Sequence, residues 1–111
     1  MILYGLKNCD SCRKARKWLD ENGFEYDFID IREDTPAPRT LKAWHEALGD
    51  ALLNRRGTTW RQLSPAEKAR ADGNIPGLLQ DHPALIKRPV LAGPQKLLSG
   101  FDADTWNKAL K

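Results

Sequence analysis

The feature that most constrains the fold is a helix pattern between two strand patterns near the start of the chain. Residues 1–4 are short, apolar and aromatic, as in a buried strand. Across residues 10–22 the apolar side chains recur at helical spacing, and Gly23 provides a stop. Residues 24–31 begin with alternating aromatic and acidic side chains, which predicts a second strand. A strand–helix–strand unit makes its two strands parallel and its connection right-handed.

The middle of the chain predicts helices only. A breaker cluster at residues 35–38 precedes a helix pattern that ends at Gly49. Ser64 marks another helix start, because a proline follows it at the first helical position and a glutamate lies three residues after it. A further short helix is expected over residues 75–80. Because residues 36–83 show no strand pattern, we expect them to form a helical insertion.

The last third returns to strands. Residues 88–92 and 96–99 are separated by Gly93-Pro94-Gln95, which predicts a hairpin, and Asp102 then caps a final helix. The complete order is β-α-β, helical insertion, β-β-α. This order predicts an α/β protein with a thioredoxin-like fold, in which helices flank a mixed four-stranded sheet.

The composition indicates one globular domain in a reducing compartment. The 111 residues are 41% hydrophobic and 30% charged, which argues against disorder. We expect a single domain over residues 1–111, with a thioredoxin-like core at 1–35 and 84–111 and the insertion at 36–83. No apolar run reaches the roughly 18 residues of a membrane span, and the N-terminus lacks a secretory layout. We therefore expect a cytoplasmic location and no membrane partner; two cysteines there indicate redox or catalytic chemistry before a structural disulfide.

The positive charge is concentrated around the two cysteines. Residues 7–17 hold five basic residues and one acidic residue, whereas the whole chain has a net charge of only +3. A nucleic-acid-binding protein more often spreads its basic residues along a stripe, so no direct nucleic-acid partner is expected. A solvated helix face is the simpler interpretation of the same pattern.

Cys9 and Cys12 form a C-x-x-C motif at the start of the first predicted helix. Unpaired N–H groups at a helix N-terminus and nearby basic residues lower the pKa of a thiol, which predicts Cys9 as the attacking thiolate. The three-residue spacing places Cys12 on the same side of the first turn, within disulfide reach, as the resolving thiol. A structural cysteine pair is an alternative. The remaining candidate ligands, His45 and His82, lack the usual spacing of a zinc site, so no metal is expected.

Three motifs carry a resemblance to a known family. They are Tyr4-Gly5-Leu6-Lys7-Asn8-Cys9-x-x-Cys12-Arg13-Lys14-Ala15, Asn54-x-Arg56-Gly57-Thr58-Thr59-Trp60 and Ile86-Lys87-Arg88-Pro89-Val90-Leu91. They resemble the arsenate reductase (ArsC)/Spx family, and within it the YffB-like branch. The resemblance covers nearly the whole chain. It implies a thioredoxin-like fold with a helical insertion, and a cis peptide bond that places Pro89 beside the cysteines.

The resemblance also implies a site. Arsenate reductases of this family use a nucleophilic cysteine, an anion-binding loop and several arginines. Cys9 matches the nucleophile, Arg88 matches one arginine, and Arg56 (or its neighbour Arg55) falls where another is expected. Guanidinium groups can stabilise a thiolate, clamp an oxyanion or bind a carboxylate such as that of glutathione. The expected catalytic residues are Cys9, Cys12 and Arg88, and those expected to bind substrate or glutathione are Lys7, Asn8, Arg13, Arg56 and Pro89.

Two departures from the family pattern disfavour arsenate as the substrate. The family's reductases carry a further arginine after the Arg-Pro strand, but residues 97–101 here contain none. Many of them also have serine where this chain has Cys12. A second thiol at that position would intercept an adduct on Cys9, which favours a dithiol cycle or thiol–disulfide exchange with glutathione.

We therefore expect a glutathione-linked thiol reductase that acts as a monomer on a disulfide, a mixed disulfide or a small oxyanion. Glutathione is the expected co-substrate, and no bound cofactor is expected. One alternative is an arsenate reductase proper. Another is a redox-sensing regulator of the Spx type, which contacts RNA polymerase to regulate transcription.

Overall fold

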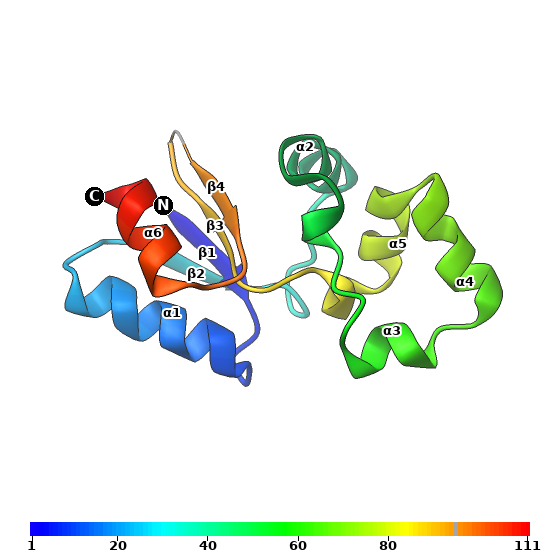
Figure 1. Cartoon of the computed structure of the whole chain (residues 1–111), viewed down its shortest axis with the longest axis horizontal. Helices are drawn as coiled ribbons and strands as arrows, with labels where there is room; N and C mark the ends of the chain where they lie inside the picture. The colour runs from blue at the N-terminus through cyan, green and yellow to red at the C-terminus, as the bar shows by residue number, and fades with distance from the viewer. Residues whose placement is uncertain (95) are drawn as a thin grey trace. The chain divides into compact units, whose positions relative to one another are not determined.

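A computed structural model describes residues 1–94 and 96–111 of the chain (Figure 1). The described residues form two compact units. The first combines Met1–Asp34 with Arg88–Lys111, and the second is Thr35–Lys87. Gln95, which belongs to the predicted hairpin turn, lies outside the described residues.

The first unit is built on a four-stranded sheet in the order β2-β1-β3-β4. Strand β1 (Ile2–Gly5) pairs in parallel with β2 (Asp27–Asp30) and antiparallel with β3 (Val90–Ala92). Strand β4 (Leu97–Ser99) pairs antiparallel with β3. One parallel and two antiparallel pairings make the sheet mixed, which confirms the predicted α/β class.

Strand β2 is shorter than predicted. It covers Asp27–Asp30, whereas the predicted strand covered residues 24–31. The N–H of Phe24 donates at 3.0 Å to the carbonyl of Leu19, at the end of the preceding helix, and its ring stacks on Trp18 with 5.8 Å between ring centroids. The aromatic start of the predicted strand therefore packs against a helix instead of extending the strand pairing.

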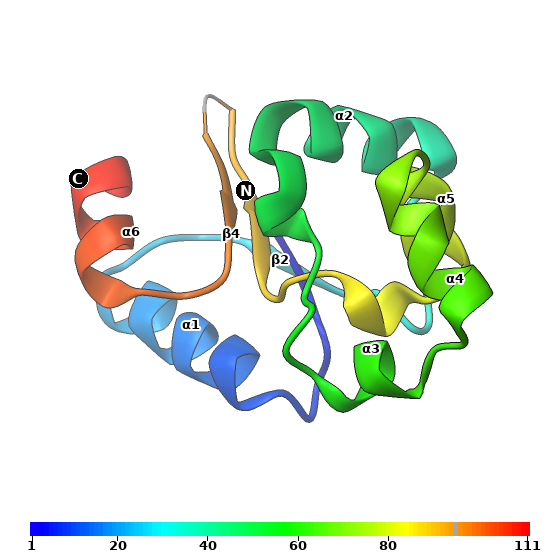
Figure 2. The same cartoon turned by 45° about the vertical axis from the view of Figure 1, so that its right-hand side comes forward.

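Two helices, α1 (Asp10–Glu21) and α6 (Ala103–Leu110), lie on the same face of the sheet (Figures 1 and 2). Helix α1 ends where Gly23 adopts a φ of +76°, a conformation that costs glycine little. Helix α6 begins with the predicted cap, because the Asp102 carboxylate accepts a hydrogen bond from the N–H of Thr105 at 3.1 Å.

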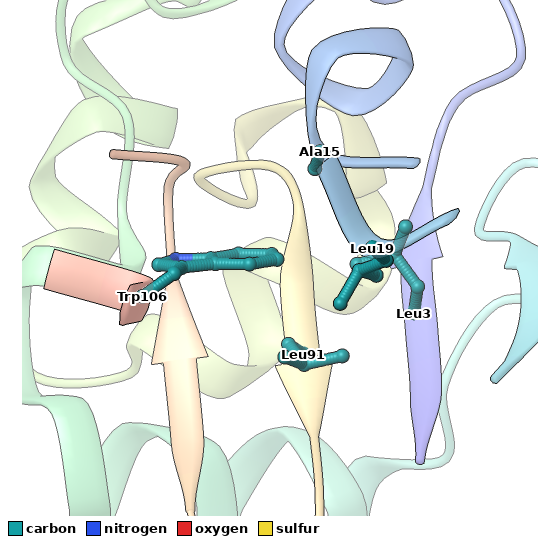
Figure 3. Packing of buried hydrophobic residues seen from close by; sticks show 5 residues of the cluster. All are labelled: Leu3, Ala15, Leu19, Leu91 and Trp106. Carbon is teal, nitrogen blue, oxygen red and sulfur yellow. The ribbon is translucent and has the colours of Figure 1, made fainter. Parts of the chain in front are cut away.

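The core of this unit lies between the two helices and the central strands. Figure 3 shows one cluster of buried side chains in this core, which come from β1, β3, α1 and α6: Leu3, Ala15, Leu19, Leu91 and Trp106. The indole N–H of Trp106 donates to the carbonyl of Gly100 at 3.0 Å, so its one polar atom is satisfied inside the core. This packing holds α1 against β1, so the chain between Gly5 and Asp10 must turn sharply at the carboxyl end of β1.

The second unit is helical. Its elements are α2 (Pro38–Leu48), η1 (Gly49–Leu52), α3 (Thr58–Gln62), α4 (Pro65–Ala69), η2 (Arg70–Asp72), α5 (Ile75–Asp81) and η3 (Pro83–Leu85). Helices α2 and α5 pack together, and α4 begins as predicted, with the Ser64 hydroxyl accepting the N–H of Glu67 at 3.2 Å. Residues 36–83 are all described, and no strand occurs among them. One isolated antiparallel β-bridge joins Leu53 to Ile86.

Helix α3 was not predicted. It spans five residues, none of them fully buried, so the sequence offers no apolar periodicity from which to infer it. Within the described ranges 1–94 and 96–111, no helix is both long and apolar enough to cross a membrane.

Candidate active site

Cys9 is the residue immediately before the first turn of α1. After β1 ends at Gly5, the chain turns, and the N–H of Cys9 donates to the carbonyl of Leu6 at 3.2 Å. The backbone of Cys9 is extended (φ −91°, ψ 126°), whereas its own carbonyl accepts the N–H of Arg13 at 2.9 Å. Cys9 is therefore the N-cap of α1, and its half-buried side chain lies where the helix exposes unpaired N–H groups.

The surroundings of Cys9 favour its thiolate. Burial raises the pKa of Cys9. Hydrogen bonds from the N–H of Cys12 and from Arg88, together with the charge of Arg88, lower it by more than burial raises it, so the net pKa is below the ordinary value. The Cys9 side chain makes no capping hydrogen bond of standard geometry. The N–H of Cys12 still lowers the pKa of the Cys9 thiol. This N–H therefore polarises the Cys9 sulfur without forming a full helix cap with it.

Cys12 has the opposite character. It lies on the buried side of α1, and none of its surface is exposed. Burial raises the pKa of its thiol to about 12, and the neighbouring Cys9 raises it as well, although the backbone N–H of Leu6 acts in the other direction. The two cysteines are unbridged. The site thus pairs a thiol whose pKa is lowered with one whose pKa is raised to about 12, and a hydrogen bond links their side chains.

Asp30 fixes the loop that leads to Cys9. It is a buried charged residue at the end of β2, and its carboxylate accepts the N–H of Lys7 at 3.3 Å and that of Arg32 at 2.9 Å. Burial raises its pKa, but the N–H groups of Arg32 and Lys7 lower it, so the net direction is down and the carboxylate is ionised at neutral pH. A charge in this position ties the turn after β1 to the neighbouring strand.

The structure brings together Cys9, Cys12 and Arg88, the three predicted catalytic residues, within the first unit. The peptide bond between Arg88 and Pro89 is cis, as the resemblance implies. Pro89 directly precedes β3, and its carbonyl accepts the N–H of Gly100 at 2.9 Å.

The side chains of the other predicted binding residues in this unit point to different partners. Lys7 forms an ion pair with Glu33 at 3.0 Å, and Arg13 pairs with Asp10 at 2.6 Å. Both pairs are exposed, so a charged ligand could exchange with the acidic partner at small cost. Asn8 is exposed in the turn before Cys9.

Arg56 belongs to the second unit. Its N–H donates to the side-chain oxygen of Asn54 at 3.1 Å, and its carbonyl accepts a hydrogen bond from Arg61 at 2.8 Å. Its neighbour Arg55 instead lies over the ring of Trp60, 5.5 Å from the centroid. These contacts order the loop backbone and leave the guanidinium of Arg56 exposed.

Sequence reasoning did not find Asp30 or Gly5, both of which contact the site. A lone acid at the end of a strand has no distinctive spacing. A glycine inside a strand is a recognised sign of close packing, so Gly5 carried a usable signal. Among the described residues, no group of three or more histidine, cysteine or acidic side chains is arranged to hold a metal.

The fold and the site together define a small α/β protein with a thioredoxin-like fold and a C-x-x-C pair at a helix N-terminus. The chain belongs to the ArsC family, whose model matches residues 4–109. A solved structure described as YffB (PA3664) protein is 39% identical, with a TM-score of 0.88, over 99% of this chain and 98% of that one.

Two further relatives differ in the activity that their names state. An arsenate reductase (ArsC) related protein from Brucella melitensis is 35% identical, with a TM-score of 0.75, over 98% of this chain and 92% of that one. The global transcriptional regulator Spx 1 of Bacillus cereus is 27% identical over 94% of this chain and 82% of its own length. The family therefore includes proteins related to reductases and proteins that regulate transcription.

Proposed function

We propose that this protein is a glutathione-linked thiol reductase of the cytoplasm, with Cys9 as nucleophile and Cys12 as resolving thiol. The observation that carries the proposal is the difference between the two thiols. The pKa of Cys9 is lowered beside Arg88 and the start of α1, whereas burial raises that of Cys12 to about 12. Such a pair separates the roles of attack and resolution, because only the thiolate is the nucleophile.

The first step is attack of the Cys9 thiolate on the glutathione sulfur of a mixed disulfide. A new sulfur–sulfur bond forms between Cys9 and glutathione, the old one breaks, and the substrate leaves as a thiolate that takes up a proton. Arg88 then faces the sulfur that has lost its charge. Its guanidinium can instead interact with a carboxylate of the bound glutathione.

In the second step Cys12 loses its proton and attacks the Cys9 sulfur, which releases glutathione as a thiolate. The Cys9–Cys12 disulfide now holds the two oxidising equivalents that came from the substrate. Two molecules of reduced glutathione return the protein to its dithiol form and leave as glutathione disulfide. Every electron that the substrate gains is therefore supplied by glutathione.

Binding of glutathione is proposed to involve the exposed polar groups around Cys9. Lys7 and Asn8 lie in the turn before α1 and Arg13 lies on α1, and the charged partners of Lys7 and Arg13 are exchangeable surface acids. Pro89 of the same unit completes this set, and the binding role of Arg56 stays a prediction from the family resemblance. Arsenate is a less suitable substrate, because residues 97–101 provide no arginine and Cys12 would intercept the Cys9 adduct.

The test is the intact mass of the reduced protein after exposure to glutathione disulfide, with mapping of the modified cysteine. Wild type should pass through a glutathione adduct on Cys9 and end as the internal disulfide. Cys12→Ser should stop at the Cys9 adduct, and Cys9→Ser should form neither product. Equal reaction of the Cys9→Ser protein would end the assignment of Cys9 as nucleophile.

A redox-sensing regulator is the second candidate, and the match to Spx 1 along 94% of the chain favours it. In that case the Cys9–Cys12 disulfide would alter contact with RNA polymerase and would not be turned over. Steady oxidation of NADPH in a coupled assay with glutathione, glutathione reductase and a mixed-disulfide substrate supports the reductase. Binding of RNA polymerase by only one redox form, without turnover, supports the regulator.

A further inference from the structure

Gly5 lies directly beneath the sulfur of Cys12. A Cβ atom built on Gly5 would be 2.5 Å from the Sγ of Cys12 and 3.3 Å from its Cβ. The first distance is far below normal van der Waals contact, and the second is already tight. The ring of Phe28 is 3.5 Å away on another side, an ordinary contact. Any side chain at position 5 would therefore meet the Cys12 sulfur first.

The backbone conformation of Gly5 does not explain the glycine. Gly5 is the last residue of β1 and has no positive φ, unlike Gly23, Gly49 and Gly100. Glycine inside a strand weakens it, because it gives up side-chain packing and loses more conformational freedom on folding. The space occupied by the Cys12 sulfur is thus the feature of the structure that accounts for glycine here.

The next residue completes a seat for the same sulfur. The backbone N–H of Leu6 donates to the Sγ of Cys12 at 3.5 Å, a distance within the range for sulfur acceptors. Because Cys12 is fully buried, water cannot take over this role. One strand end therefore supplies both the room for the sulfur and a hydrogen-bond donor directed at it.

We propose that Gly5 is a positioning residue for the resolving thiol: it seats the Cys12 sulfur against the Leu6 N–H, within reach of the Cys9 sulfur. This inference rests on the proposed dithiol cycle and concerns its second step. When Cys12 loses its proton and attacks Cys9, the Leu6 N–H faces the negative charge that develops on Cys12. A donor that is already in place stabilises this charge without reorganisation.

The experiment follows both steps in one acid-quenched time course of wild type and Gly5→Ala with glutathione disulfide, read by intact mass. In Gly5→Ala the Cys9 adduct should form at nearly the wild-type rate. Its conversion to the internal disulfide should slow by about tenfold or more, since a displacement of about 1 Å can cost a hundredfold. The adduct should accumulate in the variant and not in wild type.

Two controls separate a seat for Cys12 from a general need for glycine. Gly93→Ala, whose new Cβ would have no neighbour closer than 3.5 Å, should resolve the adduct at the wild-type rate. Gly5→Ala should lower the melting temperature markedly, but much less when it is introduced into Cys12→Ala, which removes the sulfur. If Gly5→Ala does not fold while Gly5→Ala/Cys12→Ala does, the steric seat is supported.

The outcomes also distinguish this inference from the proposed function. If wild-type Cys9 forms no adduct and no disulfide, the dithiol cycle itself fails. If wild type completes both steps and Gly5→Ala resolves its adduct equally fast, the cycle stands and the role of Gly5 is rejected. Equal destabilisation by Gly5→Ala with and without the Cys12 sulfur also rejects it, as does failure of both Gly5→Ala proteins to fold.

Discussion

The carboxylate of Asp30 accepts the backbone N–H of Lys7 at 3.3 Å, and this bond connects the end of β2 to the turn that carries Cys9. The same carboxylate accepts the N–H of Arg32 at 2.9 Å. One buried acid thus accepts hydrogen bonds from the chain segments that follow two adjacent strands, β1 and β2. Within the turn, the N–H of Cys9 also donates to the carbonyl of Leu6 at 3.2 Å, so the bond to Asp30 is the one that connects this turn to the end of β2.

Asp30→Asn should destabilise the protein and flatten its response to acid. The amide retains one acceptor oxygen but replaces the other with a donor that faces an N–H, which we expect to cost about 1 kcal/mol. The pKa of Asp30 is lowered in the folded protein, mainly by the N–H groups of Arg32 and Lys7 against the opposing effect of burial. Its contribution to stability is therefore complete above the unfolded pKa of about 3.9 and is lost as pH falls through the folded-state pKa.

Urea unfolding between neutral pH and about pH 3 tests this prediction. The gap in unfolding free energy between wild type and Asp30→Asn should shrink as the pH falls through this window. Asp34→Asn is the matched control, because Asp34 is an exposed acid four residues further on. A gap that stays constant with pH would show that the charge of Asp30 does not contribute.

Arg88→Ala should raise the pKa of Cys9. Burial already opposes ionisation of this thiol, and Arg88 lowers its pKa through both hydrogen bonding and charge. Without the guanidinium, the midpoint of thiolate formation should move to higher pH. For each unit of increase, the thiolate fraction well below the pKa falls about tenfold. The measurement is the pH dependence of thiolate absorbance in the Cys12→Ser background, which leaves Cys9 as the one titrating thiol.

Lys17→Ala is the control for Arg88, because Lys17 is an exposed cation on α1. Its removal should leave the Cys9 midpoint nearly unchanged. Arg88→Lys should restore part of the shift, since it keeps the charge but loses the planar guanidinium geometry. An unchanged midpoint in Arg88→Ala, together with unchanged glutathione binding, would remove Arg88 from the site.

The sequence predicted those parts of the fold that depend on local signals. The helix caps at Ser64 and Asp102 and the apolar spacing of α1 are readable because each involves residues within one or two turns. The limits of β2 were wrong, because Phe24 is held at the end of α1: its N–H donates to the carbonyl of Leu19 at 3.0 Å and its ring stacks on Trp18. Two local patterns overlap at this residue, and the helix end prevails over the strand alternation. Helix α3 is too short to produce a periodic pattern.

The residues of the candidate site also fall into those that the sequence predicted and those that it did not. Cys9 and Cys12 are readable from their spacing at a helix start, and Arg88 was expected only because its motif resembles that of a known family. Asp30 and Gly5 act through a backbone N–H and a shared volume that exist only after β1, β2 and α1 are packed together. A sequence pattern records residue types and spacing. A glycine in a strand can indicate close packing, but only the structure shows that the group packed against Gly5 is the Cys12 sulfur.

Trp106→Phe should destabilise the first unit by about 1–3 kcal/mol. The indole of Trp106 is almost completely buried, and its N–H donates to the carbonyl of Gly100 at 3.0 Å. Its ring packs edge-on against that of Phe101, with 5.0 Å between the ring centroids. Phenylalanine keeps an aromatic ring but leaves the carbonyl unsatisfied and a small void. Thermal unfolding should show the loss, whereas Trp60→Phe, at a half-exposed position, should cost clearly less. Equal effects of the two substitutions would contradict the central place of Trp106 in the core.

The two cysteines should differ strongly in alkylation. At neutral pH iodoacetamide should modify Cys9 in the folded protein and leave Cys12 unmodified, because burial raises the Cys12 pKa to about 12 and no part of that residue is exposed. In denaturant both should react at similar rates, since unfolded thiols share a pKa of about 8.5. Peptide mapping after a short pulse of reagent measures both sites in one sample. Rapid modification of Cys12 in the native protein would mean that the thiol leaves its seat against Gly5 and Leu6 without oxidation, and the resolving step would then need no preformed position.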